Sequence, residues 1–229
     1  MSKKPHPRAA RRGLPFDPLF RQVRKDAWKF FLGARGSHDW DHTERVLRLC
    51  LRIGKKERAD LEILMLSAVL HDIGRAEEDK SRGRISHAEA GASAARKILE
   101  ARGVEPEKIE RIIHGIKAHR FRKRGNAPAT PEAKILFDAD KLDSLGAVGV
   151  GRAFLFAGEV GARLHNPDTD ISKTRPYTKE DTAYREFMVK LRRLKDRIHT
   201  REGKRIAAER HRFMVAFFDR LNKESQGKL

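Results

Sequence analysis

The most apolar stretch of this chain, residues 61–74, ends in a histidine and an aspartate, and this feature limits the possible folds more than any other. Apolar residues recur along the stretch at helical spacing. His71 and Asp72 follow Ala68 by three and four positions, so they continue its buried face. An ionised carboxylate in a core costs roughly several kcal/mol unless it is paired or binds a metal. The pair therefore indicates a metal site or, equally, an aspartate that caps a neighbouring helix beside a core histidine.

Helical spacing of apolar residues recurs along the rest of the chain, and no convincing alternation predicts a strand. Ser86 and Glu89 have the form of a capping box, and Thr130 precedes a proline at a first helical position, so both predict helix starts. The 39% hydrophobic content supports one core, and no Pro/Gly/Ser linker divides the chain. We therefore expect a single-domain, all-α helical bundle over residues 14–222, with a basic arm at 1–13 and a tail at 223–229. We also expect a charged loop at 75–84, a cap at Thr178 and a core position for Phe213.

The net charge of +19 predicts attraction to anionic molecules, and part of it lies in the arm at residues 1–13. Nucleotides and nucleic acid both qualify, so charge alone selects no partner. The single cysteine, Cys50, excludes an intrachain disulfide and lies in an apolar helical stripe, which suits a reducing compartment. No uncharged apolar run approaches the roughly 18 residues of a membrane span, and no apolar leader follows the basic N-terminus. We expect a cytoplasmic protein without a membrane segment.

Three further polar residues fall on inward helix faces. His42 precedes Val46 by four positions, Asp140 shares a face with Asp143, and His119 continues the apolar face of its own helix. For a lone histidine at such a place, a satisfied core position is the commoner role. Their number makes a shared site the better interpretation.

Other candidates are less specific. His87 lies in a first helical turn, where backbone N–H groups favour anions, so it is a phosphate contact, a general acid or, equally, an exposed polar residue. Arg120 begins a basic loop that suits phosphates, although a solvated loop is the commoner outcome. His114 lies to one side of the face that carries His119.

Together, His42, the His71-Asp72 pair and Asp140 resemble the H…HD…D signature of the HD-domain superfamily of metal-dependent phosphohydrolases. The resemblance implies an all-α bundle in which these four residues bind one divalent metal ion. Over about residues 20–222 the chain is similar to the YedJ/YpgQ branch of bacterial HD hydrolases. The motifs that carry this similarity are His38-Asp39-x-x-His42 with Arg45-Val46, Lys134-Ile135, Asp138-Ala139-Asp140-Lys141-Leu142 and Arg152-Ala153-Phe154.

This ligand set predicts the chemistry. Two imidazoles and two carboxylates leave open positions on a six-coordinate ion, which suits Mn²⁺, Mg²⁺, Fe²⁺ or Co²⁺ better than a closed tetrahedral Zn²⁺. Such an ion activates water and polarises a phosphoryl group, and Asp72 or His119 is expected to manage the proton. The residues expected to contact the substrate are Arg45, Arg75, His87, Lys141 and Arg120.

The chain departs from the family pattern after the His-Asp pair. Arg75 stands where many HD proteins have a lysine, and its guanidinium would hold a phosphate bidentately at a shifted position. Some HD nucleotidases have an additional acid nearby, for which Glu77, Glu78 and Asp79 compete. Extra histidines make some HD enzymes binuclear, but we expect one ion here; the histidines that could supply a second site are His87, His114 and His119.

The resemblance implies a small phosphate compound as substrate. We favour a nucleotide, with cleavage of a nucleoside triphosphate to monophosphate and pyrophosphate as the leading reaction, because the predicted cations exceed what one phosphate requires. The alternatives are a nucleotidase or phosphodiesterase, or a basic nucleic-acid-binding protein with a residual HD site. The sequence indicates no oligomeric state.

Overall fold

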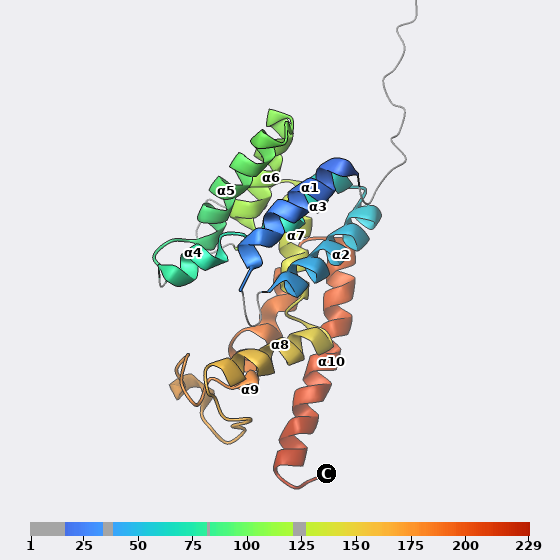
Figure 1. The fold of residues 1–229 in the computed structure, drawn as a ribbon. Helices are drawn as coiled ribbons and strands as arrows, with labels where there is room; N and C mark the ends of the chain where they lie inside the picture. Colours follow the sequence, from blue (N-terminus) through green and yellow to red (C-terminus); the bar gives the residue numbers. More distant parts are fainter. Residues whose placement is uncertain (1–16, 34–38, 82, 121–126) are drawn as a thin grey trace, which may run out of the picture.

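In the computed structural model, which describes residues 17–33, 39–81, 83–120 and 127–229, every regular element is helical (Figure 1). The expected all-α class is therefore confirmed. The basic arm at 1–13 and the loop at 121–126 lie outside the described residues. The elements are α1 (Pro18–Trp28), η1 (Lys29–Phe31), α2 (Trp40–Glu57), α3 (Leu61–Leu70), α4 (Arg75–Lys80), α5 (His87–Ala101), α6 (Pro106–Ala118), α7 (Pro131–Leu142), α8 (Gly146–Glu159), η3 (Ile171–Lys173), α9 (Ala183–Val189), η4 (Leu191–Arg197) and α10 (Arg201–Ser225).

Helix α3 lies at the centre of the fold. It packs against α1, α2, α6 and α7, and all its residues from Ile63 to Leu70 are buried. A helix surrounded on every side is apolar all round, which explains why this stretch is the most hydrophobic of the chain. The buried surface is thus wider than the single face that the spacing indicated.

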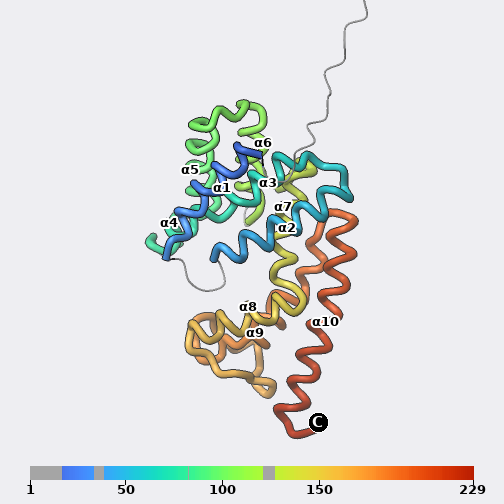
Figure 2. The backbone as a smooth tube through the Cα atoms, turned by 45° about the vertical axis from the view of Figure 1, so that its right-hand side comes forward, coloured from blue at the N-terminus to red at the C-terminus, as the bar shows by residue number. Residues whose placement is uncertain are grey.

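The remaining helices extend the same core. Helices α5 and α6 pair beside α3, while α2 and α7 pair on its other side. Helices α8 and α9 lie beyond the end of α7, and the long α10 runs along α8, α7 and α2, as both views show (Figures 1 and 2). One cluster of buried apolar side chains connects these layers. None of the described helices has the length and apolarity that crossing a membrane requires.

A buried carboxylate fixes the start of α10. Asp138, on α7, accepts hydrogen bonds from the backbone N–H groups of His199 (2.8 Å) and Thr200 (2.7 Å) and from the Thr200 hydroxyl (2.6 Å). Thr200 then caps α10 through Gly203 N. Asp138 is completely buried, so its role is to join two helices.

Three local expectations were wrong, and a fourth, the helix start at Ser86, was confirmed without its capping box. Residues 75–80 form α4 rather than a loop, because the turn after the His-Asp pair leads directly into a short helix. Ser86 begins α5, but no side-chain bond closes its predicted capping box. Thr182 rather than Thr178 caps the late helix, α9. Phe213 is 49% exposed, because it lies on the outer side of α10.

Candidate metal centre

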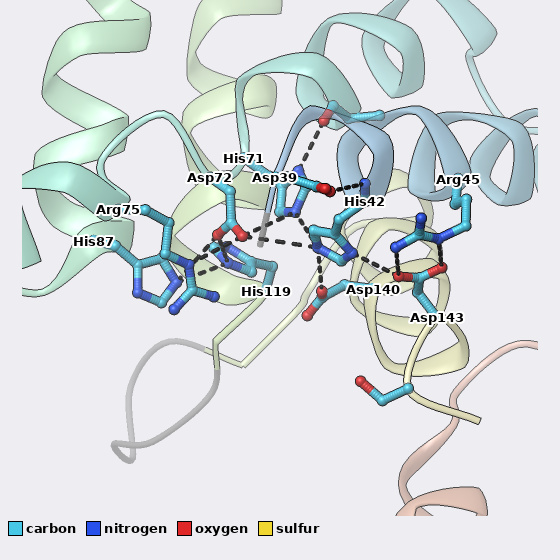
Figure 3. A network of polar contacts seen from close by, with 12 residues as sticks. Asp39, His42, Arg45, His71, Asp72, Arg75, His87, His119, Asp140 and Asp143 are labelled. Carbon is cyan, nitrogen blue, oxygen red and sulfur yellow. Dashed lines mark hydrogen bonds and ion pairs between the residues drawn. The ribbon is translucent and has the colours of Figure 1, made fainter. Parts of the chain in front are cut away.

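The termini of several helices bring buried histidines and aspartates together (Figure 3). His42 lies in the first turn of α2, His71 is the C-cap of α3, and His87 is the first residue of α5. His119 is the C-cap of α6, and Asp140 is in the last turn of α7. The histidines are at most 1% exposed. These side chains come together because the ends of the helices that carry them lie close to one another.

The first cluster consists of His42, His71 and Asp140, whose ligand atoms lie within 4.8 Å of one another. His42 Nε2 is 3.3 Å from His71 Nε2 and 3.3 Å from Asp140 Oδ1. Three of the four residues expected to bind a metal therefore meet in this cluster.

The second cluster consists of Asp72, His87 and His119. Asp72 Oδ1 lies 3.4 Å from His87 Nε2 and 3.5 Å from His119 Nε2. Its other oxygen, Oδ2, lies 3.7 Å from the Nε2 atoms of both His42 and His71. Asp72 thus presents one oxygen to each cluster and stands between them (Figure 3).

Backbone carbonyls fix the proton on two of the histidines. His71 Nδ1 is 2.8 Å from Ala68 O, and His119 Nδ1 is 2.5 Å from Ile116 O. A carbonyl oxygen only accepts, so Nδ1 carries the proton in both rings. In the neutral form, each Nε2 then presents a lone pair to its cluster.

Carboxylates do the same for the other two histidines. His42 Nδ1 is 2.7 Å from Asp143 Oδ2, and His87 Nδ1 is 2.6 Å from Glu78 Oε2. A metal-binding histidine usually donates its other ring N–H to a carboxylate or a backbone carbonyl, which selects the tautomer and orients the ring.

In each cluster two Nε2 atoms face each other, and this contact is stable only with a positive charge between them or on one of the rings. In the second cluster, His87 Nε2 and His119 Nε2 are 3.1 Å apart with a carboxylate oxygen beside them. Facing lone pairs repel, so either a cation binds between them or one ring takes up a second proton. The same holds for His42 and His71 in the first cluster.

Burial keeps two of the four histidines neutral and disfavours a second proton on their rings. Burial lowers the pKa of His71 to about 4 and that of His87 to about 2, so both stay neutral near pH 7. Burial also disfavours a charge on His42, but Asp140 and Asp143 outweigh it and raise its pKa. Burial alone would raise the pKa of Asp140, yet Lys141 and His42 hold it well below its usual value. The first cluster therefore attracts positive charge at His42 and Asp140, while His71 stays a neutral donor, and this combination fits a divalent ion.

Each cation that the sequence assigned to the substrate contacts a carboxylate of the site. Two of these contacts are to aspartates of the clusters, and both side chains keep about a quarter of their surface exposed: Arg75 (26%) and Lys141 (23%). The other two are to acids behind the histidines. The pairs are Arg75 Nε with Asp72 (3.0 Å), Lys141 Nζ with Asp140 (2.6 Å), Arg45 Nε with Asp143 (2.8 Å), and Arg120 with Glu78.

Sequence reasoning did not assign the two acids behind the rings. Asp143 was visible on the face of Asp140 but received no role. Glu78 was one of three competing acids, and only the structure separates it: it is 8% exposed, whereas Glu77 and Asp79 are exposed. His114 lies outside both clusters, with its Nε2 accepting from Ala129 N.

Comparison with known proteins identifies this arrangement. The family model of the HD domain matches residues 39–145, which contain both clusters. The chain is also 37% identical to the protein YpgQ of Bacillus subtilis over 209 residues, which are 90% of this chain and 93% of that protein. The chain belongs to the HD-domain superfamily. Members bind divalent metals, and both clusters here have donors that could hold one.

Solved structures of HD proteins agree in fold. The crystal structure of B. subtilis YpgQ in complex with ADP has a TM-score of 0.71 and 33% identity, and the match covers 90% of this chain and 94% of that one. An HD-superfamily hydrolase from Bacillus thuringiensis has a TM-score of 0.69 and 27% identity, with 90% and 96% covered. The match extends beyond residues 39–145, so α8 to α10 are part of the shared fold.

Proposed function

We propose that this chain is a divalent-metal-dependent phosphohydrolase that acts on a nucleotide. The observation that carries the proposal is the set of four buried histidines, each with Nδ1 engaged from behind and Nε2 directed at a carboxylate of the clusters. His42, His71, Asp72 and Asp140 would hold one ion. A divalent ion held there lowers the pKa of water and polarises a phosphoryl group.

We also propose a second ion, held by Asp72, His87 and His119. The sequence alone favoured one ion, with His119 managing a proton. In the structure, His87 and His119 face each other as His42 and His71 do, and Asp72 offers an oxygen to each pair. His119 is then a ligand rather than a proton acceptor.

Nucleoside triphosphate cleavage to monophosphate and pyrophosphate is the leading reaction. Water oxygen bonds to the α-phosphorus, the bond from that phosphorus to the bridging oxygen breaks, pyrophosphate leaves with that oxygen, and the proton released by the water passes to solvent. The described site pairs four acids with five cations, which are Asp72, Glu78, Asp140 and Asp143 with Arg45, Arg75, Arg120, Lys141 and Arg152. Two divalent ions would therefore make the site strongly positive, which suits a polyphosphate better than a monophosphate. Arg75 and Lys141 line the site with partly exposed side chains and would contact phosphate oxygens. YpgQ bound to ADP supports a nucleotide ligand.

A screen of nucleoside tri-, di- and monophosphates and cyclic nucleotides with Mn²⁺, Mg²⁺, Co²⁺ or Fe²⁺ tests this reaction, with products identified by mass. Asp72→Ala should abolish turnover, while Asp79→Ala, an exposed acid on α4, should not. Orthophosphate released from monophosphates, with triphosphates untouched, would replace the pyrophosphohydrolase by a nucleotidase. Metal analysis of protein purified without chelator should give two ions per chain, falling after Asp72→Ala.

Contact with nucleic acid is a second proposal, favoured by charge. Residues 190–212 contain ten lysines and arginines against three acids, and this segment spans η4 and the first half of α10. Salt-sensitive RNA or DNA binding that persists in Asp72→Ala, without hydrolysis of any phosphate compound, would make binding the main function.

A further inference from the structure

Asp143 is a buried carboxylate of the site that accepts four hydrogen bonds. It follows α7 directly and is 1% exposed. It accepts hydrogen bonds from His42 Nδ1 (2.7 Å), Arg45 Nε (2.8 Å) and Nη2 (3.1 Å), and Arg152 Nη1 (2.8 Å). Three of these donors, from His42, Arg45 and Arg152, converge on one oxygen, Oδ2.

The donors come from two helices, and the acceptor follows a third. His42 and Arg45 lie on α2, one turn apart, Arg152 lies on α8, and Asp143 directly follows α7. Two guanidinium groups fix the carboxylate in position and keep it an acceptor, because an arginine only donates. The Nδ1–H group of His42 therefore donates to a carboxylate whose orientation is fixed by the two arginines.

We propose that Asp143 is a positioning residue for His42: held by Arg45 and Arg152, it keeps the proton of His42 on Nδ1 and directs Nε2 into the first cluster. The proposal rests on the proposed function in that Nε2 serves a metal ion there. It also gives Arg45 a role other than the phosphate contact that the sequence suggested.

Asp138 shows what a purely structural acid looks like in the same helix. It is equally buried, but its partners are backbone N–H groups and a hydroxyl at the start of α10. The partners of Asp143 are all side chains, and one is a ring of the cluster. Asp138→Asn is therefore the matched control for a change at Asp143.

The first readout is the tautomer of His42 in chelator-treated protein, measured by NMR of ¹⁵N-labelled histidine rings at a pH high enough to keep His42 neutral. Asp143→Ala removes the acceptor, so His42 should become a mixture of Nδ1–H and Nε2–H forms. Asp143→Asn should restore the Nδ1–H form, because three donors converge on Oδ2 and the amide oxygen will occupy that position. Asp138→Asn should leave this signal unchanged.

The second readout is the affinity for Mn²⁺, measured by calorimetry. Loss of a carboxylate behind a metal-binding histidine typically costs about 10–100-fold in affinity. Asp143→Ala should lose at least about tenfold at the first cluster, Asp143→Asn should fall between it and wild type, and Asp138→Asn should stay within about twofold. Arg45→Met should weaken Mn²⁺ binding, with KM unchanged at saturating metal.

Asp143→Ala that folds with the wild-type tautomer and affinity would overturn the proposal. Should that variant not fold, Arg152→Met takes its place, with weaker Mn²⁺ binding expected and unchanged binding contradicting the idea. Neither readout needs turnover. A wild-type protein that binds Mn²⁺ but hydrolyses no nucleotide would remove the proposed function and leave the positioning role standing.

Discussion

Gly74 ends the turn that carries His71 and Asp72, and replacing it with alanine should disturb the second cluster selectively. A Cβ at this position would lie 2.2 Å from His87 O and 2.5 Å from Gly91 N, both backbone atoms of α5. The φ angle of Gly74 is −87°, which alanine adopts readily, so the conflict is one of space alone. A backbone atom cannot rotate away as a side chain can.

The size of the effect follows from these distances. Ordinary contact begins at 3.4 Å, so His87 O must retreat by the difference from 2.2 Å, about 1.2 Å. Overpacking of this kind costs about 1–3 kcal/mol. In a chain of this length each kcal/mol shifts Tm by about 2–4 °C, which predicts a decrease of about 2–12 °C. Because His87 moves with α5, its Nε2 leaves the second cluster, and metal affinity there should fall about tenfold or more.

Calorimetric melting and metal stoichiometry of Gly74→Ala measure both effects. Gly151→Ala is the control, because Gly151 lies on α8 and a Cβ there would have no neighbouring atom within 4 Å. That change should be neutral or stabilise the fold by up to about 1 kcal/mol. The packing argument would be refuted if Gly74→Ala had the same Tm as Gly151→Ala and still bound two ions.

Three further predictions use other parts of the structure. Glu78→Gln should weaken binding of the second ion about 10–100-fold in a Mn²⁺ titration, because Glu78 holds the His87 ring. Glu77→Gln, on the exposed side of α4, should leave that affinity unchanged. Equal effects of the two changes would contradict the role of Glu78 in orienting His87. Leu64→Ala, at a fully buried site, should lower the free energy of unfolding measured in urea by about 2–5 kcal/mol. Phe213→Ala, at a side chain that is 49% exposed, should lower it by under about 1 kcal/mol. Equal losses in the two variants would contradict this difference in burial. Burial lowers the pKa of His71 from 6.5 to about 4 and that of His87 to about 2, so the unfolded chain takes up these protons first. Chelator-treated protein should therefore lose stability between pH 8 and pH 5 in urea titrations, with His71 alone contributing on the order of 2 kcal/mol; a pH-independent stability would rule this out.

The sequence by itself determined the helical class and predicted the four residues that we propose as ligands. Helical spacing is a local property, so the inward positions of His42 and Asp140 could be recognised without any knowledge of neighbouring helices. The apolar stretch before His71 and Asp72 likewise predicted their burial, since a helix of such composition has no surface to expose. The resemblance to HD phosphohydrolases came from these same residues.

Only the tertiary structure decided how the polar residues are paired. His42 and Asp143 are 101 positions apart, and their contact depends on how α2 packs against α7, which no local pattern reports. Periodicity is also least informative at helix ends, where one residue turns a side chain by about 100°, and the cluster histidines lie there. That is why Glu78 could not be separated from its neighbours by sequence, and why the division of the ligands into two clusters around Asp72 emerged from the fold alone.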